Sequence, residues 1–269
     1  QIPREITLFC DLRELLIEGG KMKRLPSFLQ QLSKLEKLTI AKVSLSSFPV
    51  EICDGPLSKS LRDLHFQECP FVDVPDKIAE LEHLEALGFS EVHLKKVTPK
   101  LAQCHALKEL TVYFHRTYYW RRQIVPFQLP LSILEIPNLE ALFLSNMVME
   151  NEVEFFKLYL ERAIVVDDGV QFPFEIFGLN EDLQKLLYQQ LLRNPHLPII
   201  PYIRELDLSD MNMSVFNEGL RKFHALEKLD LRENILTELP VDFWTIFPKL
   251  KQNQTTRIWL LKMISQILK

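Results

Sequence analysis

Apolar residues recur along this chain in the pattern L-x-x-L-x-h, where h is an apolar residue. The pattern occurs eight times, and its copies begin at Leu12, Leu35, Leu61, Leu84, Leu107, Leu139, Ile203 and Leu226. The steps between these starts are 23, 26, 23, 23, 32, 64 and 23 residues. Four equal steps in one chain are hard to obtain by chance, so the pattern indicates a repeat protein.

A second signal follows the first at a fixed distance. Thirteen and fourteen residues after four of the starts stand an apolar residue and a proline: Leu25-Pro26, Phe48-Pro49, Val74-Pro75 and Leu239-Pro240. The alternation in L-x-x-L-x-h predicts a short strand with every second side chain buried. The proline predicts a turn on the far side, where its fixed φ is useful and its missing N–H is harmless. Apolar residues seventeen positions after the starts predict a short helix or 3-10 turn there.

This arrangement resembles the leucine-rich-repeat family in its 23-residue form, L-x-x-L-x-L-x-x-N-x-L-x-x-L-P. The resemblance covers about residues 1–115 and 203–250, and between them it holds only at 139–147. It implies an α/β solenoid with a curved parallel sheet on the concave face and with helices and turns outside. In the family, Asn or Cys at the ninth place bonds neighbouring backbone turns. Only Cys69 and Asn234 fit here, so we expect the other turns to be satisfied in another way.

The spacing of the repeats predicts how the chain is organised. We expect a single leucine-rich-repeat domain over residues 1–269, with repeats at about 12–147 and 203–250. The step of 64 residues predicts a helical insertion at about 150–200 in the middle of the solenoid. Residues 255–269 are amphipathic at helical spacing, and we expect them to cap the open end of the last repeat.

Two segments of the insertion, 152–164 and 179–193, have the apolar spacing of helices. The second helix either packs on the flank of the solenoid or docks an adaptor of a ubiquitin ligase. F-box segments and Elongin-C-binding boxes are also short leucine-rich helices, although Leu187 stands where the Elongin C box has a small residue. The repeat at 48–64 is similar to the leucine-rich-repeat substrate receptor of cullin-2 ligases. A cullin adaptor bound through 155–195 is therefore an alternative partner.

Side chains between the buried leucines should point outward from the strands and form one extended surface, with about 5 Å between strands. We expect this surface to bind a protein partner. Its candidate contact residues are His65, Gln67, Ser90, Thr111, Tyr113, Phe143, Asp207, Asp230 and Arg232. His65 is expected at an exposed position. Small residues stand at the centre of the surface, where a partner chain should approach closely: Ala86, Gly88 and Ser90.

The step of 32 residues is nine residues longer than the repeat, and the excess carries Tyr118, Tyr119, Trp120, Arg121 and Arg122. Tyr, Trp and Arg are enriched at the energetic centres of protein interfaces. The loop therefore either contacts a partner at the solenoid edge or folds its aromatic rings back over the solenoid while its arginines stay solvated. Stacking on nucleic-acid bases is a weaker alternative.

Composition and charge narrow the class of partner. The chain has 269 residues, of which 47% are hydrophobic and 25% charged, and its net charge is −4. This balance is typical of a folded globular protein and argues against a general nucleic-acid binder, which carries a basic excess. No apolar run reaches the roughly 18 residues of a membrane span. We therefore expect neither nucleic acid nor a membrane as partner. The chain opens at Gln1 within structured-looking sequence, which indicates a fragment.

Cysteine usage predicts the compartment. Cys10, Cys53, Cys69 and Cys104 form no C-x-x-C pair and no cluster. They are typical of reduced, mostly buried thiols, so we expect an intracellular protein of the cytoplasm or nucleus.

Motifs for chemistry are missing from the sequence. It has no phosphate-binding loop and no nucleophile elbow, and no histidine has the spacing of a metal ligand. We expect no catalysis, no metal and no cofactor, and we interpret the chain as a protein–protein interaction module. The alternatives are a substrate-recognition subunit of a cullin-RING ubiquitin ligase and a sensor region of a larger multidomain protein. The oligomeric state stays open.

Overall fold

The computed structural model describes residues 2–92, 94–113, 127–145, 149–166, 169–177, 179 and 181–250. The chain divides into two compact units. Unit 1 comprises Gln1–Glu152 and Phe174–Asn180, and unit 2 comprises Val153–Pro173 and Glu181–Lys269.

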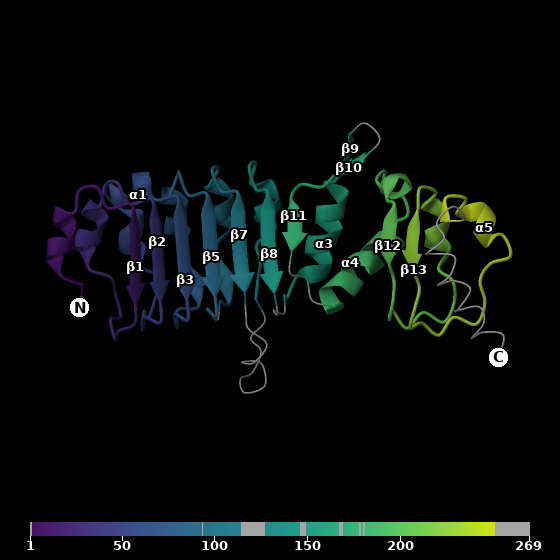
Figure 1. Cartoon of the computed structure of the whole chain (residues 1–269), viewed down its shortest axis with the longest axis horizontal. Coiled ribbons are helices and arrows are strands. Elements are labelled where there is room, and N and C mark those ends of the chain that lie inside the picture. Colours follow the sequence, from purple (N-terminus) through teal and green to yellow (C-terminus); the bar gives the residue numbers. More distant parts are fainter. Residues whose placement is uncertain are drawn as a thin grey trace. The chain divides into compact units, whose positions relative to one another are not determined.

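A seven-stranded parallel sheet forms one face of unit 1 (Figure 1). Its strands, in spatial order, are β1 (Glu14–Glu18), β2 (Lys37–Ala41), β3 (Asp63–Gln67), β5 (Ala86–Ser90), β7 (Glu109–Tyr113), β8 (Ala141–Ser145) and β11 (Glu175–Phe177). Equal repeat positions lie side by side, because Leu38 pairs with Leu64 and Leu64 pairs with Leu87. The α/β solenoid expected from the leucine spacing is therefore confirmed.

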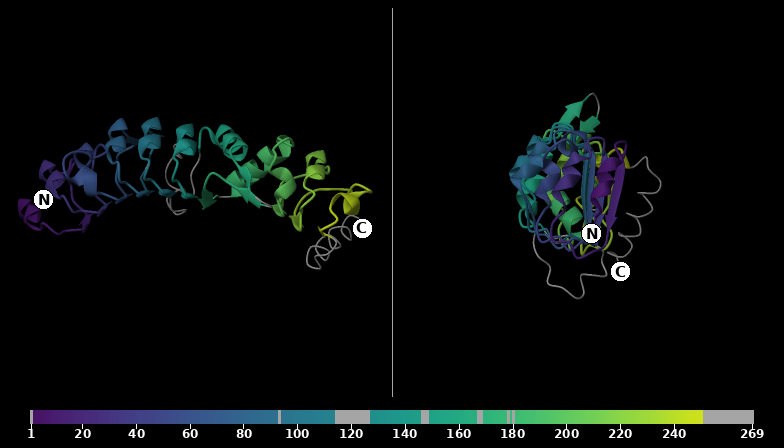
Figure 2. Two further views of the ribbon diagram at one scale, coloured as in Figure 1. Left: turned by 90° about the horizontal axis from the view of Figure 1, so that it is seen from above. Right: turned by 90° about the vertical axis from the view of Figure 1, so that its left-hand side faces the viewer.

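Short helices form the opposite side of each repeat in unit 1 (Figure 2). They are the 3-10 helices η1 (Arg4–Leu8), η2 (Ser27–Gln31), η3 (Val50–Cys53), η4 (Asp76–Glu80), η5 (Pro99–Gln103) and η6 (Leu131–Glu135), and the α-helix α1 (Leu57–Ser60). Two-residue strands β4 (Asp73–Val74) and β6 (Lys96–Val97) pair in parallel near them. Pro26, Pro49 and Pro75 each stand directly before a 3-10 helix, where no backbone N–H is needed. The predicted turn after these three prolines is thus a 3-10 helix, whereas Pro240 precedes a turn and the α-helix α5 (Phe243–Ile246).

Four phenylalanine rings fill the interior of unit 1 behind β3 and β5. Phe66 has no exposed surface and stacks on Phe89, with ring centroids 5.8 Å apart. Phe71 meets Phe66 edge-on at 5.0 Å, and Phe48 lies 5.4 Å from Phe66. Stacked and edge-to-face pairs each add about 0.5–1.5 kcal/mol beyond the burial of their area. These rings join neighbouring repeats into one core.

A left-handed residue ends the strands of most described repeats. Lys42, Glu68 and Glu91 have φ of 56°, 50° and 55°, although none of them is glycine. The backbone N–H of Lys42 donates to the Gln67 carbonyl at 2.8 Å, and that of Glu68 donates to Ser90 at 2.9 Å. The left-handed turn therefore extends the hydrogen-bonded ladder one residue beyond each strand.

Asn234 bonds neighbouring turns as the family resemblance implies. Its Oδ1 accepts the N–H groups of Met211 at 3.1 Å and Met213 at 2.9 Å. Its Nδ2 donates to the carbonyls of Leu208 at 2.7 Å and Leu231 at 3.0 Å. One side chain thus bonds backbone groups of two successive repeats. The role implied by the family resemblance for Asn at the ninth place is therefore confirmed for Asn234.

The other ninth positions use different means. The Cys69 thiol donates to the Ile40 carbonyl at 3.5 Å, which is a weaker version of the same bridge. Val43 at this position is buried, and the backbone N–H of Leu45 donates to its carbonyl at 2.8 Å. The Val43 turn is therefore satisfied by a local backbone bond instead of a side-chain bridge, as expected for a position without Asn or Cys.

β11 is a strand that the repeat pattern missed. Ile176 pairs with Leu142 of β8, so this strand continues the sheet. The sequence pattern assigned no strand to residues 171–178. The first and sixth positions of this strand's repeat are Pro173 and Gly178 rather than leucines, which hides the pattern.

Unit 2 contains the two predicted helices and the last repeats. Its elements are most of α3 (Glu152–Glu161), β9 (Ile164–Val166), β10 (Gly169–Gln171), α4 (Glu181–Arg193), η7 (Ile200–Tyr202), β12 (Glu205–Asp207), η8 (Glu218–Lys222), β13 (Lys228–Asp230) and α5 (Phe243–Ile246). β9 and β10 pair in antiparallel, and β12 pairs in parallel with β13. Residues 255–269, predicted to form a capping helix, lie outside the described residues.

Three of the four cysteine thiols are buried. All four are free, and only Cys10 is exposed. Burial raises the pKa of Cys53 and Cys104 to about 12, so these thiols stay protonated and unreactive at neutral pH. The prediction of reduced, mostly buried thiols is confirmed.

The described helices are too short or too polar to cross a membrane.

Candidate functional site

The candidate site is the outward face of the sheet in unit 1. From β2 to β8, the fifth and seventh repeat positions carry no charged residue. We call the members of this set whose side chains the structure describes the uncharged strip: Thr39, Ala41, His65, Gln67, Gly88, Ser90, Thr111, Tyr113 and Phe143. The strand register aligns the fifth positions in one row, with neighbours about 4.8 Å apart. The structure thus brings six of the predicted contact residues onto one face.

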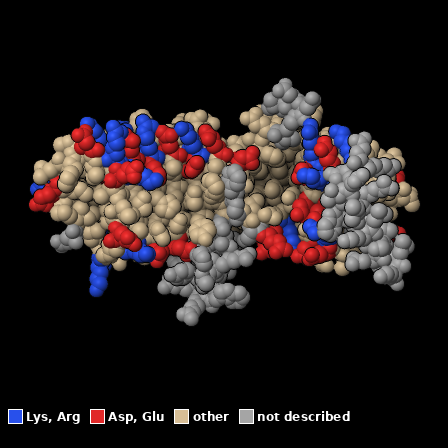
Figure 3. All heavy atoms as spheres, in the orientation of Figure 1, with Lys and Arg blue, Asp and Glu red and all other residues tan. Residues whose placement is uncertain are grey.

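Charged residues border this strip at the start of the strands (Figure 3). The second repeat positions alternate in sign, and we call them the charge ladder: Arg13, Glu36, Arg62, Glu85, Lys108 and Glu140. Glu85 pairs with Lys108 at 2.6 Å and also with Arg62, and these hydrogen bonds lower the pKa of its carboxyl. Because the signs alternate, this border presents no extended cationic surface of the kind that a phosphate backbone attracts.

His65 covers the middle of the strip. A methyl group at Gly88 would lie 2.0 Å from His65 Nδ1, so the imidazole occupies the space above that glycine. His65 Nε2 lies 3.0 Å from Ser90 Oγ, and burial lowers the pKa of His65 below its ordinary value of 6.5. The expectation that a partner chain approaches closely over Gly88 was wrong, because the ring of the neighbouring repeat fills that gap. His65 itself is half-buried rather than exposed.

Replacing Gly88 by alanine should push the His65 ring into solvent and raise its pKa toward 6.5. In the wild type, the lowered pKa contributes stability above pH about 6.5 that is lost as pH falls through the folded pKa. This pH dependence should shrink in Gly88→Ala. NMR titration of the imidazole protons measures the change. Ser90→Ala is the control, since it removes the hydrogen bond but keeps most of the burial. An unchanged His65 titration in Gly88→Ala would contradict the packing described.

Two aromatic residues stand at the β8 end of the strip. Tyr113 is 38% exposed and Phe143 is 36% exposed. The register pairs Thr111 with Phe143, so Tyr113, two residues along β7, is the diagonal neighbour of Phe143. Diagonal neighbours lie within reach of aromatic side chains. This end of the strip therefore offers the largest apolar side chains of the outward face.

The outward residues of unit 2 differ from the strip because they are charged and already paired. The Asp230 carboxylate accepts hydrogen bonds from the Arg232 Nε at 2.8 Å and from its backbone N–H at 3.0 Å. Burial alone would raise the pKa of Asp230, but the bonds from Arg232 lower it overall. Asp207 Oδ1 accepts from the N–H and the hydroxyl of Ser209 at 2.9 Å and 2.7 Å. A partner would have to displace these bonds to use the three predicted residues.

The predicted loop residues Tyr118, Tyr119, Trp120, Arg121 and Arg122 lie outside the described residues. Within the described part of the chain, no group of three or more His, Cys, Asp or Glu side chains could hold a metal ion.

Solved structures similar to this chain include the Toll–Spatzle complex of Drosophila, with a TM-score of 0.55 and 15% identity over 91% of this chain and 30% of that chain. The leucine-rich-repeat domain of the type III effector XopL has a TM-score of 0.48 and 18% identity, covering 87% of this chain and 73% of the other. A leucine-rich-repeat protein of Leptospira interrogans has a TM-score of 0.45 and 22% identity, over 92% of this chain and 61% of that one. At such identities the likeness concerns the fold alone, which is the leucine-rich-repeat fold.

Similarity to curated sequences is limited to part of the chain. A probable serine/threonine-protein kinase of Dictyostelium discoideum is 30% identical over an alignment of 125 residues, and the match covers 36% of this chain and 4% of the kinase. No protein-family model matches the chain. The chain thus spans a small fraction of that kinase and 30% of the chain that it matches in the Toll–Spatzle complex.

Proposed function

We propose that this chain is a non-catalytic interaction module that binds a protein partner through the uncharged strip. The observation that carries the proposal is the register of the sheet in unit 1, which gathers nine uncharged outward residues beside the charge ladder. The leucine-rich-repeat fold supports a role in protein interaction. The free, mostly buried thiols support an intracellular location as part of the same proposal.

The composition of the strip fits the centre of an interface. Interface centres are depleted in charged residues and enriched in aromatic ones, while their rims are polar. Tyr113 and Phe143 supply the exposed aromatic surface, and the charge ladder supplies a polar rim. Hydroxyl and amide groups of Thr39, Gln67 and Thr111 would need partner groups once water is excluded, since unpaired buried polar groups cost about 1–3 kcal/mol each. They would therefore select a partner with matching polar groups.

The test replaces both aromatic residues, Tyr113 and Phe143, by alanine in the full chain. Losing interface anchors of at least 1.4 kcal/mol should lower the affinity for the partner by about tenfold or more. Val50→Ala is the matched control, because Val50 is 37% exposed and belongs to η3 on the opposite side of its repeat. Quantitative affinity capture followed by titration of each captured protein measures the change. If every captured protein binds the double variant as tightly as the control, the strip is not the binding surface.

A substrate receptor of a cullin-RING ubiquitin ligase is the second candidate, with the adaptor bound through 155–195. It is favoured by the helix α4, where Leu186, Leu187 and Tyr188 are only half-buried. Against it, Leu183 and Leu191 of the same helix are already buried. Recovery of an F-box adaptor or Elongin C together with a cullin would support this candidate, and recovery of other partners without them would reject it.

A recognition region of a larger multidomain protein is the third candidate. The partial similarity to the kinase of Dictyostelium discoideum favours it. Mass spectrometry of the endogenous protein, captured through an antibody against unit 1, tests it. Peptides confined to this chain would reject it.

A further inference from the structure

The middle of the uncharged strip is able to take up a positive charge. His65 is the one member of the strip whose side chain gains a proton close to neutral pH. Its ring lies over Gly88, the one member without a side chain, and its Nε2 lies 3.0 Å from Ser90 Oγ. A change in pH at this position therefore alters the charge of the strip.

The ring of His65 fits closely against the backbone of β5. Its Nδ1, Cε1 and Cγ atoms lie 2.0, 2.6 and 3.1 Å from the place that a methyl group at Gly88 would take. His65 and Gly88 are partners in the strand register, so the ring leans from β3 over the neighbouring strand. If the ring turned away, the backbone of Gly88 would be uncovered. The shape of the strip therefore depends on the orientation of one side chain.

A neutral imidazole suits this place better than a charged one. A neutral ring has one N–H donor and one bare nitrogen, whereas a protonated ring has two donors. Ser90 is the only residue of β5 whose side chain accepts a hydrogen bond, and it already lies beside Nε2. Nδ1 faces the Gly88 backbone, whose polar groups are used in pairing with β3 and β7. A proton on Nδ1 would therefore have no acceptor unless the ring turned toward water.

The charged neighbours of His65 leave this preference in place. Burial is the largest cause that lowers the pKa of His65, while the Asp63 carboxylate on β3 raises it and Lys37 on β2 lowers it. These two neighbours are bound to each other, since Asp63 Oδ2 lies 2.9 Å from Lys37 Nζ. The strand under the ring, β5, has no titratable side chain. The imidazole is therefore mostly neutral at pH 7 and takes up its proton below pH about 6.5.

We propose that His65 is a proton-dependent cover of the uncharged strip. The neutral ring stays beside Ser90 and completes a closed, uncharged surface. The protonated ring turns into solvent, uncovers the backbone of Gly88 and brings a positive charge to the middle of the strip. The movement of the ring is independent of the proposed function, whereas its role as a control of partner binding rests on that function.

Protonation should weaken binding at the strip. A partner that covers the strip excludes water, and a charge without a counter-charge is costly to bury at the centre of an interface. The partner therefore binds the neutral form and lowers the pKa of His65 further. The affinity should be constant above pH about 6.5. It should fall by up to about tenfold for each pH unit as the pH drops through the pKa of His65 in the free protein.

Nuclear magnetic resonance of the full chain, with isotope-labelled histidine and glycine, tests the movement. The nuclear Overhauser effect between the His65 ring and the Gly88 α-protons should be lost with the same midpoint as the titration of His65. His65→Gln should abolish the pH dependence of the Gly88 resonances. His105→Gln is the control and should leave it unchanged, because His105 is exposed and lies outside the strip. A contact that survives protonation, or Gly88 resonances that still titrate in His65→Gln, would overturn the movement.

Affinity measured against pH tests the control of binding. The probes are the proteins that the full chain captures at about pH 7.5 and that a variant with both Tyr113→Ala and Phe143→Ala no longer captures. Their affinity should fall with pH for the wild type and for His105→Gln, and should be nearly independent of pH for His65→Gln.

Two results would overturn the control of binding. They are a wild-type affinity that stays constant or rises as the pH falls, and a fall of equal size in His65→Gln. If the double variant still captures every protein, the proposed function fails together with this control. The contact between His65 and Gly88 then still decides whether the ring moves on protonation.

Discussion

Replacing Phe66 by alanine is expected to lower the free energy of unfolding of unit 1 by about 3–5 kcal/mol. Phe66 has no exposed surface, and its ring contacts the rings of Phe48, Phe71 and Phe89. The substitution removes apolar surface and also leaves a cavity, because the neighbouring rings belong to different repeats and cannot all close in. Stability of this size is a large part of what holds a domain folded.

Urea denaturation followed by far-UV circular dichroism measures this loss, and amide exchange in β3 assigns it to unit 1. Phe66→Leu should cost less than Phe66→Ala because it leaves a smaller cavity. Leu16→Ala is the matched control on the same sheet, since Leu16 is 61% exposed and should change stability little. Equal losses for Phe66→Ala and Leu16→Ala would show that the aromatic cluster is not packed as described.

Replacing Asn234 by alanine is expected to destabilise unit 2 by about 2–4 kcal/mol. The amide side chain holds the N–H groups of Met211 and Met213 and the carbonyls of Leu208 and Leu231. Alanine removes the partner and leaves half-buried backbone groups unpaired, and each of these costs more than the bond itself contributed. The loss should appear as a lower urea midpoint and as faster amide exchange in β12 and β13.

Two variants frame this result. Asn234→Cys keeps a weak donor, as at Cys69, and should lose less stability than Asn234→Ala. Asn138→Ala removes an exposed side chain that donates to the His105 carbonyl, and its loss should be small. If Asn234→Ala lost no more stability than Asn138→Ala, the hydrogen bonds of Asn234 would not contribute to the stability of unit 2.

The sequence predicted the sheet well because register follows from local spacing. Each leucine pattern specifies which side chains are buried, so equal positions must lie side by side once the strands pair. The role of Asn234 was predictable for the same reason. The strand β11 was not predicted, because Pro173 and Gly178 stand where the leucines of the repeat pattern would be. The charge ladder has a signal in the sequence as well, because the sign of the charge alternates at the second position of successive repeats.

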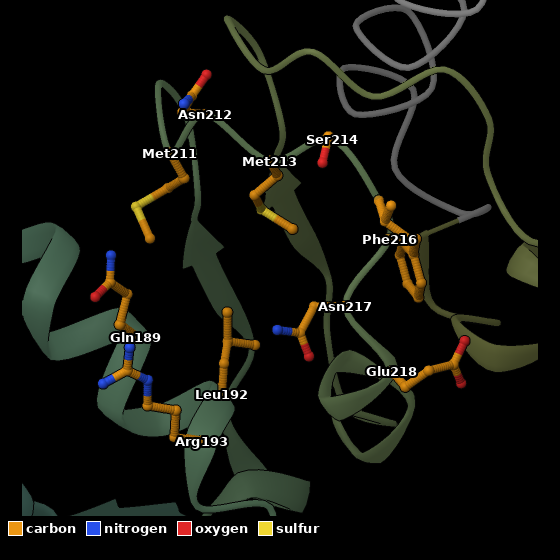
Figure 4. A pocket seen from close by; sticks show the side chains of 11 residues that line it. Gln189, Leu192, Arg193, Met211, Asn212, Met213, Ser214, Phe216, Asn217 and Glu218 are labelled. Atoms are coloured by element: carbon orange, nitrogen blue, oxygen red, sulfur yellow. The ribbon is translucent and has the colours of Figure 1, made fainter.

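Features that depend on side chains crossing between repeats were not predictable from spacing. His65 covers Gly88 because its ring leans toward the next strand, a choice of rotamer that no period encodes. A hollow in unit 2 lies between α4 and residues 211–218, which are separated by the whole segment 194–210 (Figure 4). Such sites form only when tertiary packing brings distant segments together.

The constancy of strand register despite unequal repeat lengths has a consequence for how such a chain can change. The step from Leu35 to Leu61 has 26 residues and that from Leu107 to Leu139 has 32, yet Lys37 still faces Asp63 and Glu109 still faces Ala141. Extra residues, including those of α1, are accommodated in the connections between strands. Insertions and deletions there are therefore close to neutral for the outward face, whereas a one-residue insertion within a strand would exchange its buried and outward side chains. The lengths of the connections and the side chains of the outward face can therefore change independently of one another, in evolution or in design, while the sheet stays the same.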